Sequence, residues 1–182
     1  MPLLPTPLGV FTYPDTTESP NISVWTAHAL TQVEQVIDRQ RPSVRCAKTN
    51  SVGIISGGSG SAIFWNIEEW DPNDMHSPTT NANRLTAPLA GEYSVNAQLS
   101  FANDTSGVRQ VSIRANGATI VAVNSASPVS GLPTRVNLAG SARLAVGGYV
   151  ELLGFHTSST SPLAVEVGSG ATWMSMRWER GL

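Results

Sequence analysis

Tyr93-Ser94-Val95-Asn96-Ala97-Gln98-Leu99-Ser100-Phe101 is the stretch that decides the fold. Every odd-numbered position in it is apolar and every even-numbered position is polar. Successive side chains of a β-strand point to opposite faces, so this alternation predicts a strand with one buried face and one solvent-facing face. The strand must therefore belong to a sheet that packs on a core with one of its faces.

A tight hairpin is predicted after this strand, at Asn116-Gly117. Asparagine and glycine tolerate the positive φ angles that a two-residue hairpin turn requires. If Ala115 opposes Ala118 across the turn, then Ile113 opposes Ile120 on the same face. We therefore expect Ile113 and Ile120 to lie opposite each other on one face of the hairpin.

Further apolar runs, separated by Gly, Ser and Pro, surround this hairpin. They lie at residues 44–55, 62–70, 135–139, 142–146, 149–156, 163–167 and 171–178. About eight to ten short strands at this spacing, after a single helix, are typical of an antiparallel sandwich or barrel. We therefore expect a mainly β fold.

The first part of the chain has a different character. Residues 1–21 hold five of the twelve prolines, which favour an extended arm. A short helix is predicted next, because Ser23 can cap its start and Pro42 stops it after Arg41. The apolar stripe of this helix consists of Trp25, Ala29, Leu30, Val33, Val36 and Ile37. We therefore divide the chain into an anchoring and assembly segment at 1–42 and a head domain at 43–182.

The stripe of the predicted helix has to be covered, because a helix of under about twenty residues is marginal alone in water. Two arrangements would cover it. The helix packs on its own domain or on copies of itself, or it docks the chain onto a larger assembly.

Composition and charge restrict the kinds of partner. Only 13% of the residues are charged, against about 25% in a typical domain, and the net charge is -2. Such a surface makes nucleic acid and anionic membranes poor partners. No stretch approaches the ~20 apolar residues of a membrane span, and the N-terminus lacks a charged leader, so we expect no membrane insertion and no export by the ordinary route. Cys46 is the single cysteine, which excludes an intrachain disulfide and a cysteine-based zinc site.

Two strands near the C-terminus, at 149–155 and 173–176, carry apolar side chains on both faces. A small sandwich buries only one face of each sheet, so we expect a second cover from the arm, the helix or another subunit. We favour another subunit, because exposed aromatic strips promote symmetric association. The predicted interface residues are Tyr93, Phe101, Tyr149, Phe155 and Trp173.

A family resemblance appears in the run Asn83-Arg84-Leu85-Thr86-Ala87-Pro88-Leu89-Ala90-Gly91-Glu92-Tyr93-Ser94-Val95. It resembles the T-A-P-x-A-G-x-Y signature of the tumour necrosis factor and complement globular-head jelly rolls. Residues 107–117 and 144–152 are similar to two further segments of that family in the same order, although Gly148 stands where the family usually has Asp. The resemblance implies an antiparallel jelly-roll sandwich and a compact homotrimer, with one sheet of each domain turned toward the threefold axis.

The opening of the chain, from Tyr13-Pro14-Asp15 through Pro20-Asn21, is similar to the openings of many tail and appendage proteins of actinobacterial phages. This similarity implies a virion structural protein that is assembled in the host cytoplasm and is joined to other virion proteins by its arm and helix. Its head would bind a glycan or protein of the host surface, at a tail tip or fibre. A capsid-mounted head spike or decoration protein is one alternative, and a carbohydrate-binding module of cellular origin is another.

The chain offers little that is typical of catalysis. Gly57-Gly58-Ser59-Gly60 lacks the helix that follows a nucleophile elbow. The three histidines, His28, His76 and His156, have no short metal-ligand spacing. We therefore predict a protein that is not an enzyme and that uses no cofactor.

Two other side-chain groups could bind ligands. Asp71 and Asp74 are the weak metal candidates, in a loop with fewer oxygens than calcium requires, where we expect Asp71 to hold a turn. Indole rings could stack on sugars or anchor a protein, although their positions in strands favour the core or a subunit interface. These rings belong to Trp65, Trp70, Trp173 and Trp178.

Overall fold

The computed structural model describes residues 41–54 and 57–182 of the chain. The regular structure within these residues is entirely β and antiparallel. The strands are β1 (Ser43–Ala47), β2 (Gly53–Ile54), β3 (Ser61–Ala62), β4 (Ile67–Trp70), β5 (Arg84–Thr86), β6 (Gly91–Phe101), β7 (Arg109–Ala115), β8 (Thr119–Ala126), β9 (Thr134–Leu144), β10 (Tyr149–His156), β11 (Leu163–Ala164) and β12 (Trp173–Arg180). The predicted antiparallel sandwich is confirmed, whereas the arm and the helix, up to residue 40, lie outside the described residues.

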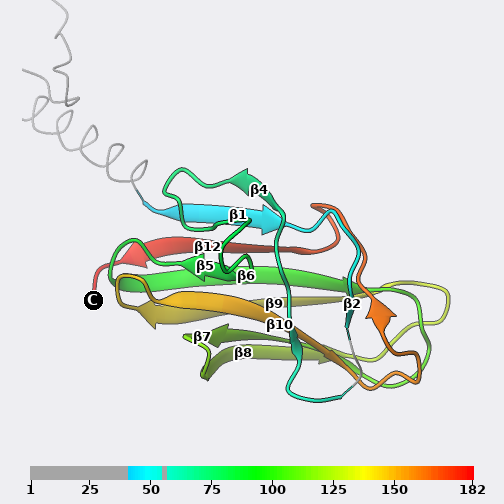
Figure 1. The fold of residues 1–182 in the computed structure, drawn as a ribbon. Coiled ribbons are helices and arrows are strands. Elements are labelled where there is room, and N and C mark those ends of the chain that lie inside the picture. The colour runs from blue at the N-terminus through cyan, green and yellow to red at the C-terminus, as the bar shows by residue number, and fades with distance from the viewer. Residues whose placement is uncertain (1–40, 55–56) are drawn as a thin grey trace, which may run out of the picture. The chain divides into compact units, whose positions relative to one another are not determined.

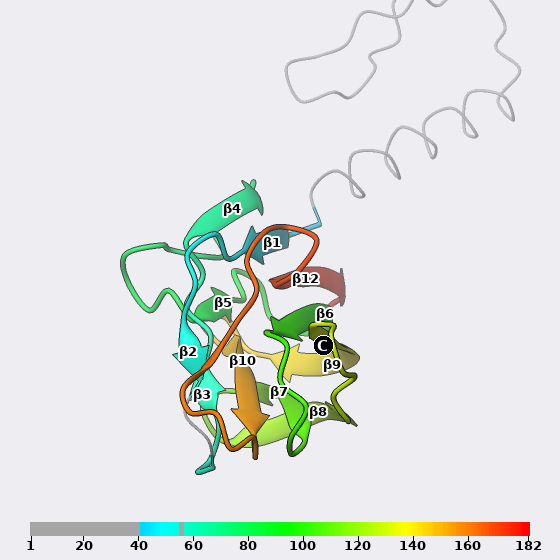
Figure 2. The ribbon, with the colours of Figure 1, turned by 90° about the vertical axis from the view of Figure 1, so that its right-hand side faces the viewer.

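The strands form two layers (Figures 1 and 2). The first sheet has the order β4-β1-β12-β6-β9, and the second has the order β3-β10-β7-β8, with β5 paired to β10. A small third sheet pairs β11 with β2. Most neighbours in each sheet are distant in sequence, as the jelly roll requires. Residues 41–54 and 57–182 contain no helix long and apolar enough to span a membrane.

The alternating stretch forms β6, in the first sheet between β12 and β9. Its odd-numbered side chains, from Tyr93 to Phe101, are each 0–1% exposed and point into the core between the layers. The even-numbered Asn96 faces solvent. The period of two therefore placed this strand and its buried face correctly.

The hairpin between β7 and β8 has the predicted turn but a different register. Asn116 and Gly117 have φ angles of 49° and 70°, and the Ala118 amide donates to the Ala115 carbonyl over 3.1 Å. However, Ala115 pairs with Thr119, and a bulge after Ile113 places Ile120 opposite Arg114. Ile120 is consequently 50% exposed on the outer face, so the expected pair of Ile113 with Ile120 is wrong.

The face of β10 that points away from the core is partly covered by residues of the same chain. Glu151 and Leu153 point away from the core, yet they are 3% and 4% exposed. Glu151 pairs with Arg84 of β5, and Leu153 pairs with Ala62 of β3. At these two positions, the expectation that another subunit, the arm or the helix must supply the cover is wrong, because β3 and β5 lie beside β10.

The two ends of the domain are distinct. The described chain begins and ends at one of them, where the Trp178 amide donates to the Pro42 carbonyl over 2.8 Å and Arg180 pairs with Glu92. Strand register places three loops, 102–108, 127–133 and 157–162, at the other end (Figure 1). We call the end that carries these three loops the loop end.

Candidate functional site

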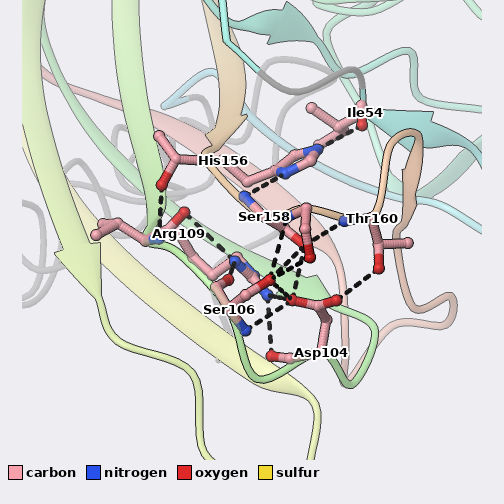
Figure 3. A network of polar contacts seen from close by, with 10 residues as sticks. Ile54, Asp104, Ser106, Arg109, His156, Ser158 and Thr160 are labelled. Carbon is pink, nitrogen blue, oxygen red and sulfur yellow. Dashed lines mark hydrogen bonds and ion pairs between the residues drawn. The ribbon is translucent and has the colours of Figure 1, made fainter.

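The loop end is held together by polar contacts between two of its loops (Figure 3). The Val108 amide donates to Thr157 Oγ1 over 2.9 Å, and the Thr157 amide donates to the Val108 carbonyl over 3.1 Å. The hydroxyls of Ser106 and Ser159 lie 3.0 Å apart. Loop 102–108 is therefore fixed to loop 157–162.

Asp104 is the centre of this network, and its side chain is 12% exposed. Oδ1 accepts hydrogen bonds from the Ser158 hydroxyl over 2.7 Å and from the Ser106 amide over 2.9 Å. Oδ2 accepts one from Thr160 Oγ1 over 2.7 Å. These bonds, with Ser158 as the largest contributor and Thr160 next, hold the pKa of Asp104 well below its usual range. The carboxylate is therefore ionised at any ordinary pH.

Arg109, the first residue of β7, is completely buried beneath Asp104. Its Nη2 lies 2.9 Å from Asp104 Oδ1 and 3.0 Å from the Asp104 carbonyl, and its Nη1 donates to the Ser106 carbonyl over 2.8 Å. The Nε atom of Arg109 is buried without a hydrogen-bond partner among the described residues. The ion pair still fixes its surroundings, because removing one partner leaves the other uncompensated. This pair therefore makes loop 102–108 rigid.

His156 closes the network from β10, with no exposed surface. Its Nε2 lies 2.6 Å from the Ile54 carbonyl, and its Nδ1 accepts the Ser158 amide over 3.2 Å, so the proton is on Nε2. Both ring nitrogens are thus engaged by the backbone, and the Ser158 hydroxyl donates to Asp104 instead. Serine, histidine and aspartate meet here, but they do not form the relay that an acyl-transfer nucleophile needs.

Apolar side chains are exposed in loops 102–108 and 127–133 of the loop end. Val108 is 42% exposed, Val129 is 59% exposed and Leu132 is 60% exposed. The braced, hydroxyl-rich loops 102–108 and 157–162 are suited to contact with another molecule, since little order has to be gained on binding.

The acidic loop that contained the metal candidates is a closed turn. Both carboxylate oxygens of Asp71 accept backbone amides, from Met75 over 2.9 Å and from His76 over 2.8 Å. The buried His76 ring lies between Glu68 Oε1, at 2.8 Å, and the Ala82 carbonyl, at 3.1 Å. Asp74 has a φ of 51° in this turn. Within residues 41–54 and 57–182, no group of three or more His, Cys, Asp or Glu side chains could hold a metal ion.

The predicted interface residues separate into two groups. Tyr93 and Phe101 have no exposed surface and belong to the protomer's own core, where the Tyr93 hydroxyl donates to the Leu89 carbonyl over 2.7 Å. The prediction that these two side chains contact another subunit is therefore wrong. Tyr149, Phe155 and Trp173 are half-buried and retain surface that a partner could cover.

Two of the four tryptophans considered above flank an arginine on the first sheet. The Arg45 guanidinium lies 3.9 Å from the ring centroid of Trp173 and 5.8 Å from that of Trp70. Arg45 also forms an ion pair with Glu69, and Trp70 is 48% exposed. In contrast, Trp65 is 1% exposed and Trp178 packs against the core.

The predicted assembly helix lies outside the described residues, so the structure does not place its stripe. The stripe residues concerned are Trp25, Ala29, Leu30, Val33, Val36 and Ile37.

Sequence reasoning did not identify the buried pair of Asp104 and Arg109. One signal was present, because Arg109 continues the odd-numbered phase of Val111 and Ile113, which are buried. An arginine on the buried face of a strand needs a buried partner of opposite charge.

Comparison with known proteins supports the fold. No protein-family model matches the sequence, and no curated protein is similar enough to match it. Among solved structures, the chain is similar to the Eiger TNF of S. frugiperda, with a TM-score of 0.60 and 10% identity over 78% of this chain and 94% of that one. It is also similar to murine APRIL at pH 5.0, with a TM-score of 0.57 and 12% identity over 77% and 100% of the two chains. The globular domain of zebrafish complement 1qA gives a TM-score of 0.54 and 12% identity over 79% and 100%. The head domain therefore has the jelly-roll fold of the tumour necrosis factor and complement globular-head proteins.

Proposed function

We propose that this chain is a structural protein of a phage particle, attached through its N-terminal segment, and that the loop end of its trimeric head contacts the host surface. The observation that carries the proposal is the opposition of the two ends. The anchoring segment joins the head at Pro42, and the braced loops 102–108 and 157–162 lie at the other end. A head attached at Pro42 can present these loops to a partner.

Self-association is supported by the outward face of the first sheet. Ser175, Asn96 and Ala139 lie side by side across β12, β6 and β9, and such small or polar side chains allow a flat, close approach of another copy. Trp173 and Arg45 border this row and can supply the apolar and charged anchors that interfaces favour. In a trimer, three weak contacts of the loop end would add by avidity.

The solution mass tests the trimer. We expect the mass of three 19.2-kDa chains at micromolar concentration, and a monomer would contradict the proposal. Trp173→Ser should shift the mass toward the monomer, because it removes one of the two indole rings that flank Arg45 on this face. Val167→Ser, at a residue that is 41% exposed outside the regular strands, serves as the matched control and should leave the mass unchanged.

Adsorption of particles to host cells tests the role of the loop end. The double variant Val129→Asp and Leu132→Asp should reduce adsorption about tenfold or more without changing incorporation, since it places charges on exposed loop tips. The matched control is Leu89→Asp with Val146→Asp, whose positions are 48% and 68% exposed near the opposite end. Equal adsorption of the two double variants would refute contact through the loop end and would favour a capsid decoration protein.

The anchoring role has its own test. Val33→Asp with Ile37→Asp should abolish incorporation into particles while the head remains folded, because both residues belong to the predicted stripe. Gln32→Asp, on the polar side of the predicted helix, should have little effect. Incorporation of the stripe variant at the normal level would show that the helix is not the anchor.

A carbohydrate-binding module remains the second candidate, and Trp70 favours it. Its ring is 48% exposed at the edge strand β4, beside Arg45, and an exposed indole face is the surface on which sugar rings stack. Binding of a neutral polysaccharide by the wild type, lost in Trp70→Ala, together with absence from particles, would favour this function.

A further inference from the structure

We infer that the outer face of the second sheet carries a binding site for the carboxylate group of an acidic sugar, formed by Arg84, Arg114 and Tyr149. The site lies away from the loop end, since Glu151 at its centre is five residues from His156, or about 17 Å along the strand. The inference goes beyond the proposed function and does not depend on it.

The site is a row of side chains across three strands. Strand register places Arg84 of β5 and Arg114 of β7 on either side of Glu151 of β10. Arg114 donates from Nε and Nη2 to Glu151 Oε2, over 3.2 and 3.0 Å, whereas Arg84 Nε lies 3.6 Å from Oε1. Asn83 donates from its side-chain amide to Oε1. The buried carboxylate is thus already satisfied by Arg114 and Asn83.

The charges in this row do not balance. Two guanidinium groups face one carboxylate, which leaves one positive charge in excess. Three other carboxylates of the described residues have arginine partners elsewhere: Asp104 pairs with Arg109, Glu92 with Arg180 and Glu69 with Arg45. A ligand with one negative charge would compensate the excess.

Arg84 is oriented by stacking. Its guanidinium carbon lies 4.0 Å from the ring centroid of Tyr149, and this contact restricts the positions that the group can take. The Nε atom is buried without a hydrogen bond, so the 34% exposure of the side chain belongs to its other atoms. The Nη groups of Arg84 form no hydrogen bond with residues 41–54 or 57–182. A fork of donors held in place in this way matches a carboxylate.

Further donors lie beside this fork. Arg114 is 29% exposed, and its Nη1 makes no hydrogen bond within the described part of the chain. The Tyr149 hydroxyl likewise makes no hydrogen bond within the described part of the chain. Gly117 leaves room beside this hydroxyl, because a Cβ added to Gly117 would lie 3.0 Å from the hydroxyl oxygen. A carboxylate on a ring that also carries hydroxyl groups can use both kinds of donor, which favours an acidic sugar over a simple carboxylic acid.

Calorimetric titration of the full-length protein tests the site. The probes are an oligosaccharide of glucuronic acid, the matching neutral glucose oligosaccharide, and a short peptide with a free C-terminal carboxylate. We expect the glucuronic acid probe alone to bind, with a Kd on the order of 1 mM for each site. Binding of the peptide but not of the acidic sugar, or equal binding of the acidic and neutral sugars, would overturn the inference.

Three variants and one control locate the binding. Arg84→Gln should weaken it about tenfold or more, and Arg84→Lys nearly as much, because lysine keeps the charge but loses the fork. The control Arg135→Gln removes the same charge from an exposed position on β9 of the other sheet and should have no effect. If Arg84→Gln lowers the melting temperature, its effect on binding no longer tests the site by itself, and Tyr149→Phe provides the test instead. Tyr149→Phe removes only the hydroxyl and should weaken binding severalfold. Unchanged binding in Tyr149→Phe and Arg84→Lys would refute the site, whereas a normal solution mass and normal adsorption of the same variants would leave the proposed function intact.

Discussion

Removal of Arg109 is the most direct perturbation of the loop end. Arg109→Met keeps much of the side-chain volume but deletes the guanidinium that lies 2.9 Å from Asp104 Oδ1. Three hydrogen bonds of 2.8 to 3.0 Å are lost with it, to Asp104 and to the Ser106 carbonyl.

The structure gives the size of the effect. Breaking a buried ion pair by removing one partner costs about 3–5 kcal/mol. Asp104 keeps the hydroxyls of Ser158 and Thr160 as donors, so we expect a loss at the lower end, about 3 kcal/mol in the free energy of unfolding. For a domain of this size, that loss lowers the melting temperature by roughly 10 °C.

Calorimetry and urea unfolding measure the loss, with Arg135→Met as the matched control at an exposed position of β9. Amide exchange should also become faster in loops 102–108 and 157–162 than in β6, because the ion pair ties those loops. A destabilisation below about 1 kcal/mol, or a uniform change in exchange, would refute the conclusion that this pair makes loop 102–108 rigid.

Three further perturbations test other features. The pKa of Asp104 is lower in the folded than in the unfolded chain, so the contribution of this carboxylate to stability is complete above about pH 4 and is lost as the pH falls toward the folded pKa. The melting temperature of Asp104→Asn should therefore fall less steeply below pH 4 than that of the wild type. Parallel curves of melting temperature against pH would contradict this expectation. Gly107 and Gly131 have φ angles of 71° and 80°, but only at Gly107 would an added Cβ meet backbone, 2.4 Å from the Thr157 carbonyl. Gly107→Ala should therefore destabilise the domain by about 2 kcal/mol more than Gly131→Ala, as measured by urea unfolding. Equal losses of stability in the two variants would count against the close contact. Cys46 is buried, and this burial, together with the nearby Glu68, raises the pKa of its thiol. Iodoacetamide should therefore modify Cys46 only in denaturant, which mass spectrometry can follow. Rapid modification of the native protein would contradict the burial of this side chain.

The parts of the fold that depend on local pattern could be predicted from the sequence. The alternation of β6 and the positive φ angles of Asn116 and Gly117 are properties of short segments, and both are present in the structure. The register of the hairpin was missed, because a period of two does not show the bulge that skips Val121 in the pairing of β7 with β8, on the strand where β8 meets β9. There the Asn124 side chain donates to the Asn137 carbonyl over 2.7 Å, and a Cβ on Gly140 would lie 2.9 Å from Ala122.

The candidate sites were harder to predict, because they join residues that are distant in sequence. Asp104 meets Ser158 and Thr160 only after β6, β7 and β10 have assembled, and Glu151 receives Arg84 and Arg114 from two other strands. The assignment of Tyr93 and Phe101 to an interface had a different cause. Their own alternation indicates the buried face of β6, whereas aromatic character alone does not distinguish a core residue from an interface residue.

Loop 127–133 differs from the two braced loops in a way that affects how the protein can diversify. Its internal contact is a long hydrogen bond from the Leu132 amide to the Val129 carbonyl, at 3.4 Å, and Gly131 has open space around it. Strands β8 and β9 fix only the two points where the loop leaves and rejoins the sheets. Insertions or exchanges of sequence in this loop should therefore be tolerated without loss of folding, so that new surface chemistry can be acquired on an unchanged scaffold.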